Sequence, residues 1–532
     1  MLLLTSVVLS AQVTLTSTNL PILIIETENG QSIPDEPKRN AELRIVYNGP
    51  GELNRPTDEV YDYQGRIGIE LRGQTSQNFD KKPYGFETRD AMGENNNVEL
   101  LGMPAENDWV LHNPFSDKSL IRNAVTYILA GRIMEYAPRV RMVEVMVNGE
   151  YMGVYLLTEK IKRDKNRVAV SKLTPESEDI TGGYIMKFDK GNEVAFTSDY
   201  RPPTGNGQET RFLYHYPDID DITNEQAAYI KNFIDEMEDV LASDNFTDPE
   251  TGYRQYLDPE TFMDFLFINE LTRNVDGYRL SSYFYKDRDS KGGRLKMGPV
   301  WDFNLALGNA NYCEGGKFTG WGYSFNSFCP QDFWVIHFWW NRLLSDPNFK
   351  TDMTERWNRY RSGPLSDESV LGVIDSLTNL LTSEGAADRN FRRWPVLDQY
   401  VWPNAFVGGS YDAEIEYLTS WTRSRMSWLD QAFNTATSIP PNGQTNQLTT
   451  YPNPVQQDGE LVFQYTFNSR FITTVKLYNS LGQFVAELTE NEVELRNENK
   501  FTWRQLPAAG IYYYNVVSLN GVEFAGKIVI TD

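Results

Sequence analysis

Apolar and polar residues alternate with a period of two through much of the first part of the chain. Ile67, Ile69 and Leu71 follow this rule in one run, and such alternation is typical of a half-buried antiparallel strand. Comparable runs separated by turns occupy residues 20–84. An Asn-Gly pair at residues 148–149 lies between two more alternating runs and predicts a β-hairpin, because both residues tolerate positive φ. We therefore expect a β-rich lobe first.

The spacing of apolar residues changes to a helical period after Thr223. In residues 224–241, Ile230, Ile234 and Met237 fall on one face of a predicted helix. Asp258 and Pro259 predict the N-cap and first position of the next helix. An earlier helix capped by Asp117 is predicted at residues 120–129, and further helical runs occupy residues 368–381 and 414–433.

Residues 320–344 are unusually rich in aromatic side chains. We interpret this segment as a helix buried beneath the helical lobe. The alternative is an exposed platform on which a sugar or a peptide stacks.

The pattern changes again after residue 433. Residues 434–448 form a polar linker that contains Pro and Gly and has no periodicity. Residues 449–532 contain six short strand-like runs and predict a small β-sandwich. Residues 1–11 are apolar, end in small residues and are interpreted as the remnant of a signal peptide, so residues 12–433 make up the main domain.

Composition limits the kinds of partner. The chain has 532 residues, which is more than one hydrophobic core usually serves. Its formal net charge of −23 repels a phosphate backbone, so we expect no nucleic-acid partner. After the first residues, no apolar run is long enough to predict a transmembrane segment.

The segment from Glu270 to Gly308 carries the candidate chemistry. Asp276 precedes a strand-like run, a polar turn reverses the chain, and a second run leads to Asp302. A hairpin between two aspartates places both at the same end of a rigid element, where they suit a hard divalent cation that bridges phosphates. The structural alternative is that Asp276-Gly277 forms a common turn and Asp302 caps a loop or helix.

This segment resembles the catalytic region of the CotH (spore-coat protein H) kinases. The resemblance rests on Asn274-Val275-Asp276 and on Pro299-Val300-Trp301-Asp302-Phe303. It implies an atypical protein kinase with ATP and Mg²⁺ as cofactors. The expected fold is α+β, a kinase-like two-lobed arrangement with a β-rich N-lobe and a helical C-lobe, followed by the small all-β sandwich.

Kinase logic then assigns roles to the two aspartates. Asp276 accepts or orients the proton of the attacking hydroxyl, and Asp302 holds magnesium on the nucleotide phosphates. Kinases usually place a metal-binding Asn five residues after the catalytic Asp, and here Ser281 stands at that position. A hydroxyl is a weaker magnesium ligand, so Asn304 is a second candidate ligand.

The resemblance also suggests nucleotide-binding residues. Residues 72–77 and 81–84 are similar to Gly- and hydroxyl-rich and lysine motifs of the same family. Lys82 is the first candidate for the nucleotide lysine, Lys81 the second, and Arg72 supports them. An ordinary solvated basic turn is the alternative. Glu159 is placed at the connection between the lobes, and Asn274 is assigned to the cofactor site.

The last eighty residues resemble the type A sorting domain of type IX secretion cargo. The resemblance rests on motifs at residues 451–454, 477–482, 506–512 and 526–530. It implies the type IX secretion machinery as a partner and export across the outer membrane of a Gram-negative bacterium, to a secreted or surface location.

Cys313 and Cys329 are the only cysteines. In an oxidising compartment they can close a loop of about 15 residues, which would contribute on the order of 3 kcal/mol. Two unrelated buried thiols are the alternative.

Two functions follow for the whole chain. The first is an exported kinase that transfers the γ-phosphate of ATP to Ser or Thr hydroxyls of proteins. The second is a catalytically weak, pseudokinase-like adhesion, matrix or carbohydrate-binding protein, in which the fold is kept for binding.

Overall fold

The structure is a computed structural model that describes residues 13–191, 194–203, 208–437, 448–465, 472–479, 484–489, 500–504, 506–518 and 521–531. The predicted signal-peptide remnant lies outside these residues, as does most of the linker. The chain divides into two compact units, Met1–Asn434 and Thr435–Asp532, which are described separately.

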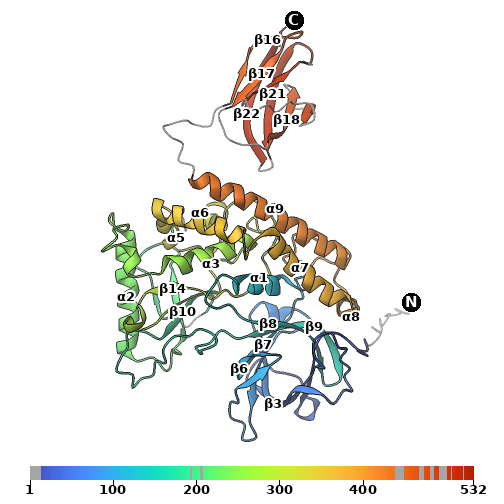
Figure 1. The fold of residues 1–532 in the computed structure, drawn as a ribbon, viewed down its shortest axis with the longest axis vertical. Coiled ribbons are helices and arrows are strands. Elements are labelled where there is room, and N and C mark those ends of the chain that lie inside the picture. Colours follow the sequence, from blue (N-terminus) through green and yellow to red (C-terminus); the bar gives the residue numbers. More distant parts are fainter. Residues whose placement is uncertain are drawn as a thin grey trace, which may run out of the picture. The chain divides into compact units, whose positions relative to one another are not determined.

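The larger unit begins with a closed β-barrel, drawn in blue to cyan in Figure 1. Alternate residues such as Leu23, Ile25, Ile67 and Ile69 fill its interior, so the period-two pattern is confirmed. In order around the barrel the strands are β1 (Ile22–Thr27), β2 (Arg39–Val46), β3 (Tyr61–Leu71), β4 (Tyr84–Arg89), β7 (Asp108–His112), β9 (Glu150–Glu159) and β8 (Val140–Val147). The barrel closes through the parallel pairing of β1 with β8.

The predicted hairpin at residues 148–149 is confirmed. Strands β8 and β9 pair antiparallel, and Asn148 and Gly149 have φ values of 49° and 79°. A small two-stranded sheet, β5 (Val98–Leu100) and β6 (Met103–Glu106), lies between β4 and β7 in the sequence.

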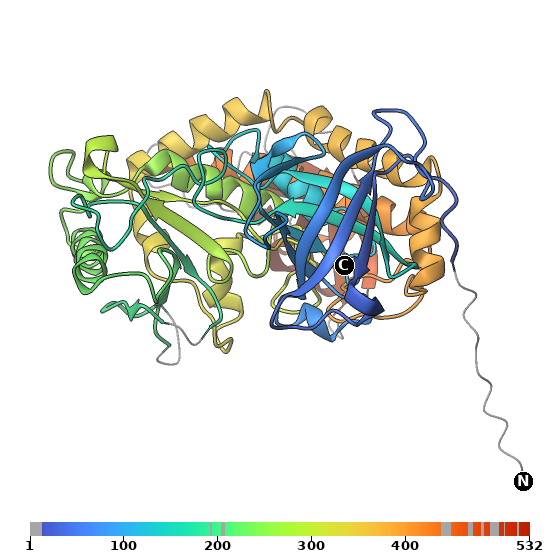
Figure 2. The same ribbon diagram turned by 90° about the horizontal axis from the view of Figure 1, so that it is seen from below.

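A second sheet lies beside the barrel, as Figure 2 shows. Its central strands pair through residues that the sequence predicted to be extended, including the β13–β14 hairpin. Its order is β11 (Phe196–Thr197), β12 (Arg211–Tyr216), β10 (Tyr184–Phe188), β13 (Ser282–Lys286) and β14 (Leu295–Met297).

Helices cover the second sheet and the barrel. Helix α3 has buried residues on all its faces, which marks it as the central helix of this unit. The helix predicted after Thr223, the helix predicted to begin at Pro259, and those predicted at residues 368–381 and 414–433 are all present. The bounds are α1 (Arg122–Ala130), α2 (Asn224–Ala242), α3 (Pro259–Thr272), α4 (Phe325–Phe328), α5 (Trp339–Leu343), α6 (Pro347–Arg361), α7 (Asp367–Thr382), α8 (Ala386–Arg393) and α9 (Tyr411–Thr437).

Two predictions about helices are corrected by the structure. Residues 320–344 do not form one buried helix but contain a 3-10 turn at Gly322–Ser324 and the short α4 and α5, with Pro330 between these two helices. Several of their aromatic side chains, including Trp339 and Trp340, are nevertheless fully buried. Asp117 is not the N-cap of α1, because the helix begins five residues later; its carboxylate instead accepts a hydrogen bond from the Arg122 backbone (2.8 Å).

The smaller unit is all-β. Its six predicted strands are present, together with two short ones. They form two sheets, one of β15 (Leu448–Tyr451), β17 (Leu461–Tyr465) and β20 (Lys500–Trp503), the other of β16 (Val455–Gln456), β22 (Gly521–Thr531), β21 (Gly510–Ser518), β18 (Ile472–Asn479) and β19 (Phe484–Thr489). Across the described ranges of both units, each helix is too short or too polar to traverse a bilayer.

Candidate functional site

The β13–β14 hairpin brings Asp276 and Asp302 to its same end. Asp276 lies six residues before β13 and Asp302 five residues after β14. Asn274 connects the two segments: its Oδ1 accepts a hydrogen bond from the backbone N–H of Asp276 (3.2 Å), and its Nδ2 donates to the backbone oxygen of Asp302 (3.3 Å). The predicted proximity of the two acidic segments is therefore present in the structure.

A buried ion pair holds the loop that carries Asp276. Glu270, on the last turn of α3, and Arg425, on α9, are both inaccessible to solvent, and their charged atoms lie 2.8 Å apart. The Tyr278 hydroxyl and the backbone N–H groups of Gly322 and Tyr323 donate to the same carboxylate, at 2.8–2.9 Å. Although burial lowers the pKa of Arg425 to about 9, its side chain still carries charge at neutral pH.

Helix α1 holds the segment that carries Asp302. The backbone N–H of Asp302 donates to the Tyr127 hydroxyl (2.9 Å), and the backbone N–H of Phe303 donates to Asn123 Oδ1 (2.6 Å). Asp302 has a φ of 65°, a left-handed conformation that few non-glycine residues adopt. Because two side chains fix this strained backbone, the direction of the Asp302 carboxylate is defined by α1.

Asp302 combines accessibility with an enclosing environment. Its residue is exposed to solvent, yet protein surrounds it closely enough that desolvation raises the pKa of its carboxyl group to about 6. Repulsion from Asp276 and from Asp189 contributes to this increase and Arg72 and Lys190 oppose it, so that about 6 is the net pKa. An accessible group with these properties lies in a recess, and Asp302 does line a cavity of about 90 Å³.

Arg72 lines the same cavity. Its guanidinium lies over the Trp301 ring, 5.5 Å from the centroid, and burial lowers its pKa. Its Nη1 is buried and has no hydrogen-bond partner in the described part of the chain. A buried donor without a partner is costly, so this atom is suited to an anionic ligand.

Asp276 has partners on its other side. Arg279 Nη2 donates to Asp276 Oδ1 (2.8 Å), and Tyr312 Oη lies 3.5 Å from the same oxygen. Arg279 also pairs with Asp332 (3.2 Å). The second carboxylate oxygen of Asp276 is therefore the one left to accept a hydrogen bond from a ligand.

The two predicted lysines lie in different environments. Lys82 donates to the backbone oxygen of Gln77 (2.8 Å) and supports the turn before β4, and it does not line the cavity with Arg72. Lys81 is fully buried and bonds to the backbone of Val154 and to Asn390 Oδ1 (2.8 Å). Desolvation holds the pKa of Lys81 well below its usual range. The structure thus places the Lys81 side chain between β9 and α8, where protein groups occupy it.

Glu159, Asn304 and Ser281 complete the predicted set. The Glu159 carboxylate is buried and is bonded to Arg139 (3.0 Å) and Tyr136 (3.2 Å), so its side chain is occupied by protein groups. Asn304 is half-buried two residues after Asp302, and its backbone oxygen accepts from Asn309. Ser281 is half-buried and precedes β13, with a φ of 46°.

Sequence reasoning missed several groups near Asp302. Asp189 and Lys190 follow β10, and both act on the pKa of Asp302. Lys187 on β10, whose role the sequence left open, lies 3.5 Å from Asp189. The only signal for Asp189 was its position at the end of a predicted strand. For Asn123 and Tyr127, nothing in the local pattern indicated contacts about 180 residues away.

Cys313 and Cys329 form a disulfide, with Cα atoms 5.4 Å apart. The bridge closes the segment between Tyr312, which contacts Asp276, and Asp332, which contacts Arg279. The predicted pairing is present in the structure, and it ties together two neighbours of Asp276.

Comparison with known proteins accounts for this arrangement. A family model described as CotH kinase protein matches residues 69–429, a range that contains both aspartates, Arg72 and most of the larger unit. The chain belongs to the CotH kinase family. A second model, the secretion system C-terminal sorting domain, matches residues 449–531. The CotH resemblance and the type IX sorting domain expected from the sequence are thus confirmed, and the sorting domain implies secretion or export to the cell surface.

Other comparisons add little to the CotH assignment. Among curated proteins, none matches this chain. Among solved structures, the twitchin kinase region from C. elegans aligns with 97% of this chain and 99% of that chain at 9% identity. Its TM-score of 0.15 is too low to carry an argument about the fold.

Proposed function

We propose that this CotH family protein is an exported atypical kinase that transfers the γ-phosphate of ATP to a Ser or Thr hydroxyl with the help of Mg²⁺. The observation that supports the proposal most directly is the meeting of Asp276 and Asp302 at one end of the β13–β14 hairpin, with Asn274 between them. The barrel beside a sheet-and-helix region is compatible with a two-lobed kinase-like fold. The sorting domain suits export across the outer membrane of a Gram-negative bacterium.

The residues present fit a magnesium nucleotide. Asp302 offers an accessible carboxylate whose ionisation is opposed by two other carboxylates, and a divalent cation would relieve that repulsion. Arg72 offers a buried donor without a partner, which suits a phosphate oxygen. When bound, Mg²⁺ neutralises charge on the phosphates. Asp302 would hold it, with Asn304 as the nearest candidate for a second protein ligand.

Each residue of the site would then have a separate role in the transfer. Asp276 would accept or orient the proton of the attacking hydroxyl, and Arg279 and Tyr312 would keep its carboxylate in place. Arg72 would neutralise phosphate charge beside Asp302. Lys82 remains a candidate for the nucleotide lysine only if its contact with Gln77 is exchanged for a phosphate contact.

Thermal unfolding with Mg-ATP tests nucleotide binding. Mg-ATP at a hundred times its Kd should stabilise the larger unit by about 2.7 kcal/mol, because only the folded chain binds it. Asp302→Ala should abolish the increase in Tm. Glu260→Ala, which removes an exposed carboxylate outside this recess, is the control and should keep the increase. Equal melting of the wild type with and without Mg-ATP would contradict the proposal.

The affinity for Mg²⁺ should depend on pH through Asp302. Its pKa is about 6, so below pH 6 a proton occupies the carboxylate and competes with the cation. Affinity should rise as pH increases through 6, level off above pH 7, and be about tenfold weaker at pH 5. Calorimetric titration with Mg²⁺ alone avoids the titration of nucleotide phosphates. Asp302→Asn should remove this dependence; an unchanged affinity between pH 5 and pH 7 in the wild type would argue against Asp302 as the ligand.

A binding protein without catalysis is the second candidate. Ser281 occupies the position where kinases carry a metal-binding Asn. Near Asp276, Tyr312 stacks on Trp402 with centroids 6.0 Å apart, and Trp402 remains 51% exposed. An exposed aromatic pair of this kind suits the stacking of a sugar or peptide group. If Mg-ATP does not raise the Tm of the wild type, this alternative is favoured.

A further inference from the structure

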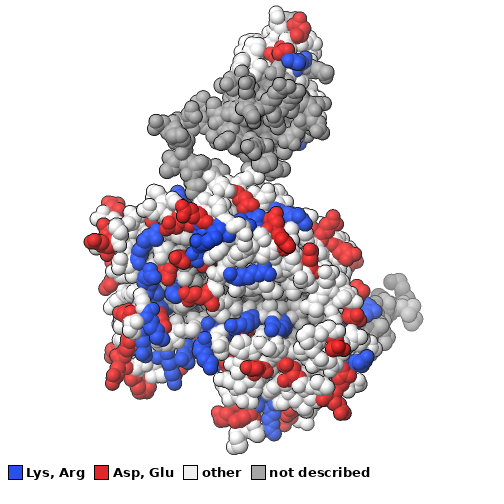
Figure 3. Space-filling view, viewed as in Figure 1, with Lys and Arg blue, Asp and Glu red and all other residues white. Residues whose placement is uncertain are grey.

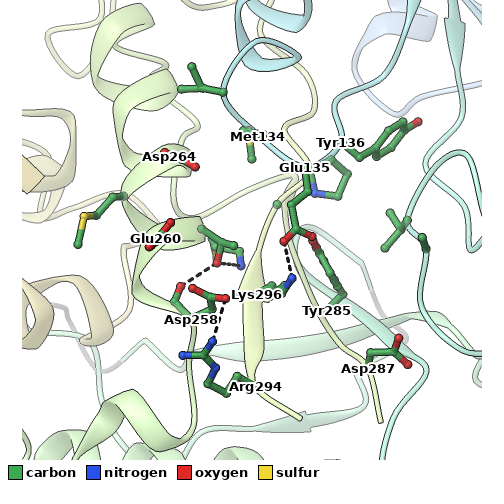
Figure 4. Close-up of a pocket in the computed structure, with 18 of the residues that line it drawn as sticks. Met134, Glu135, Tyr136, Asp258, Glu260, Asp264, Tyr285, Asp287, Arg294 and Lys296 are labelled. Atoms are coloured by element: carbon green, nitrogen blue, oxygen red, sulfur yellow. Dashed lines mark hydrogen bonds and ion pairs between the residues drawn. The ribbon is translucent and has the colours of Figure 1, made fainter. Parts of the chain in front are cut away.

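A second cavity, of about 1110 Å³, opens on the larger unit away from the recess of Asp302. Neither Asp276, Asp302 nor Arg72 lines it. Its walls come from β14, the first turn of α3, the last turns of α6 and the segments before β8 and after β9. Figure 4 shows Lys296 and Arg294 in the middle of the cavity lining, between Asp258 and Glu260 on one side and Glu135 on the other.

The cavity gathers positive charge on a strongly acidic chain. Nine Lys or Arg residues and seven Asp or Glu residues line it, although the whole chain carries −23. An adjoining depression of about 460 Å³ shares Lys165 and Lys291 with it and adds Arg163, Lys172 and Arg288, with no carboxylate in its lining. Figure 3 shows Lys and Arg gathered on this face, over the region where Figure 1 places β10 and β14. We call the two depressions together the basic cleft.

Some cations of the basic cleft are neutralised and others are not. Lys296 pairs with Glu135, Arg294 with Asp258 (3.4 Å), and Arg356 with Asp264 (2.7 Å). Lys165 and Arg359 are exposed, and within the described residues neither forms an ion pair or a side-chain hydrogen bond. These two side chains lie on different walls, so a ligand that meets both must extend across the cavity.

We propose that the basic cleft binds an acidic polysaccharide. A polymer of uronate or sulfate-bearing sugars presents negative charges at intervals, which suit Lys165, Arg359 and the adjoining depression. Its hydroxyl groups are hydrogen-bond donors, which suit carboxylates such as Glu260 and Glu355 that also line the cavity. The ligand thus satisfies both kinds of charge in the lining.

The same lining disfavours other polyanions. An acidic peptide offers one backbone N–H donor for each carboxylate, whereas a uronate residue within a chain offers two hydroxyl donors, so the peptide would satisfy fewer of the seven acidic side chains and meet more of their repulsion. A nucleic acid carries a denser charge and faces the repulsion of the whole chain. Hydroxyl donors distributed between the charges are what distinguish the acidic glycan from both.

Calorimetric titration of the full chain with a galacturonate hexamer, without nucleotide, tests the proposal. The hexamer should bind, while its fully methyl-esterified form and a hexaglutamate peptide should bind at least tenfold more weakly. Lys165→Glu and Arg359→Glu should each weaken binding at least fivefold. Arg423→Glu, an equal charge change at an exposed arginine of α9 outside the cleft, should alter it less than twofold.

Several results would overturn the assignment. No binding of the hexamer at millimolar concentration, or equal binding of its methyl ester, would exclude an acidic polysaccharide as the ligand of the basic cleft. Equal binding of hexaglutamate would make the cleft a peptide site. Equal effects of Arg359→Glu and Arg423→Glu would show that only the net charge matters. Because the readout requires no phosphate transfer, failure of the kinase proposal would leave it unaffected.

Discussion

Asp276→Asn should reduce the transfer of labelled γ-phosphate from ATP by about 10²- to 10⁴-fold, the usual range for loss of a positioned acid–base group. The amide keeps the size of the side chain and its contact with Arg279, but it cannot accept the proton of the attacking hydroxyl. Stabilisation by Mg-ATP should persist, because Asp302 and Arg72 are unchanged. The measurement is the rate of incorporation into the protein itself or into an added serine-rich protein.

Asp332→Asn is the matched control for that experiment. Asp332 is the second carboxylate that pairs with Arg279, at 3.2 Å, and it has no assigned contact with the acceptor. Its amide variant should transfer phosphate within a few-fold of the wild type. If both variants lose activity equally, the position of Arg279 rather than the chemistry of Asp276 limits the reaction. If Asp276→Asn remains fully active, Asp276 has no part in proton transfer.

Arg425→Met should destabilise the larger unit by about 3–5 kcal/mol, because it leaves the buried Glu270 carboxylate without a counter-ion. Urea denaturation followed by tryptophan fluorescence measures the loss. The double variant Glu270→Gln with Arg425→Met should recover part of it, because the amide carries no charge and its single oxygen can still accept from Tyr278 and Tyr323, while the N–H of Gly322, which donates to the other carboxylate oxygen, loses its acceptor.

Arg423→Met serves as the control on the same helix. Arg423 is exposed on α9, two residues before Arg425, and its replacement should change the free energy of unfolding by less than about 0.5 kcal/mol. A similar loss for both variants would mean that α9 tolerates no methionine there. If Arg425→Met were neutral, the ion pair would not stabilise the loop of Asp276.

Local patterns predicted the elements of this fold because they depend on neighbouring residues. The alternation around Ile67 and the Asn-Gly pair at residues 148–149 fixed strands and a turn that the structure contains. The same alternation cannot show that β1 pairs with β8, because barrel closure joins segments about 120 residues apart. The aromatic segment 320–344 was predicted as one helix because its aromatic residues indicated burial. Aromatic side chains such as Trp339 and Trp340 are indeed buried, but burial does not require a continuous helix.

In the candidate site, too, features set by neighbouring residues could be predicted and contacts between distant residues could not. Asp276 and Asp302 could be predicted as neighbours because one hairpin connects them. The environments of Lys81 and Lys82 could not be distinguished, since the partner of Lys81 is Asn390, 309 positions further along. The contacts of Tyr127 with Asp302 are equally remote in the sequence. Long-range partners decide which polar side chains remain free for a ligand, and one sequence does not contain that information.

The ion pair between α3 and α9 has a consequence for how the chain is made. Glu270 and Arg425 are 155 positions apart, so a ribosome that has just translated α3 must continue to the middle of α9 before the arginine exists. Until then the nascent polypeptide contains Glu270 without the arginine that neutralises its carboxylate in the folded protein. A polypeptide that ends before Arg425 would therefore contain the Glu270 carboxylate without its counter-ion, and the loop of Asp276 would lack the ion pair that holds it.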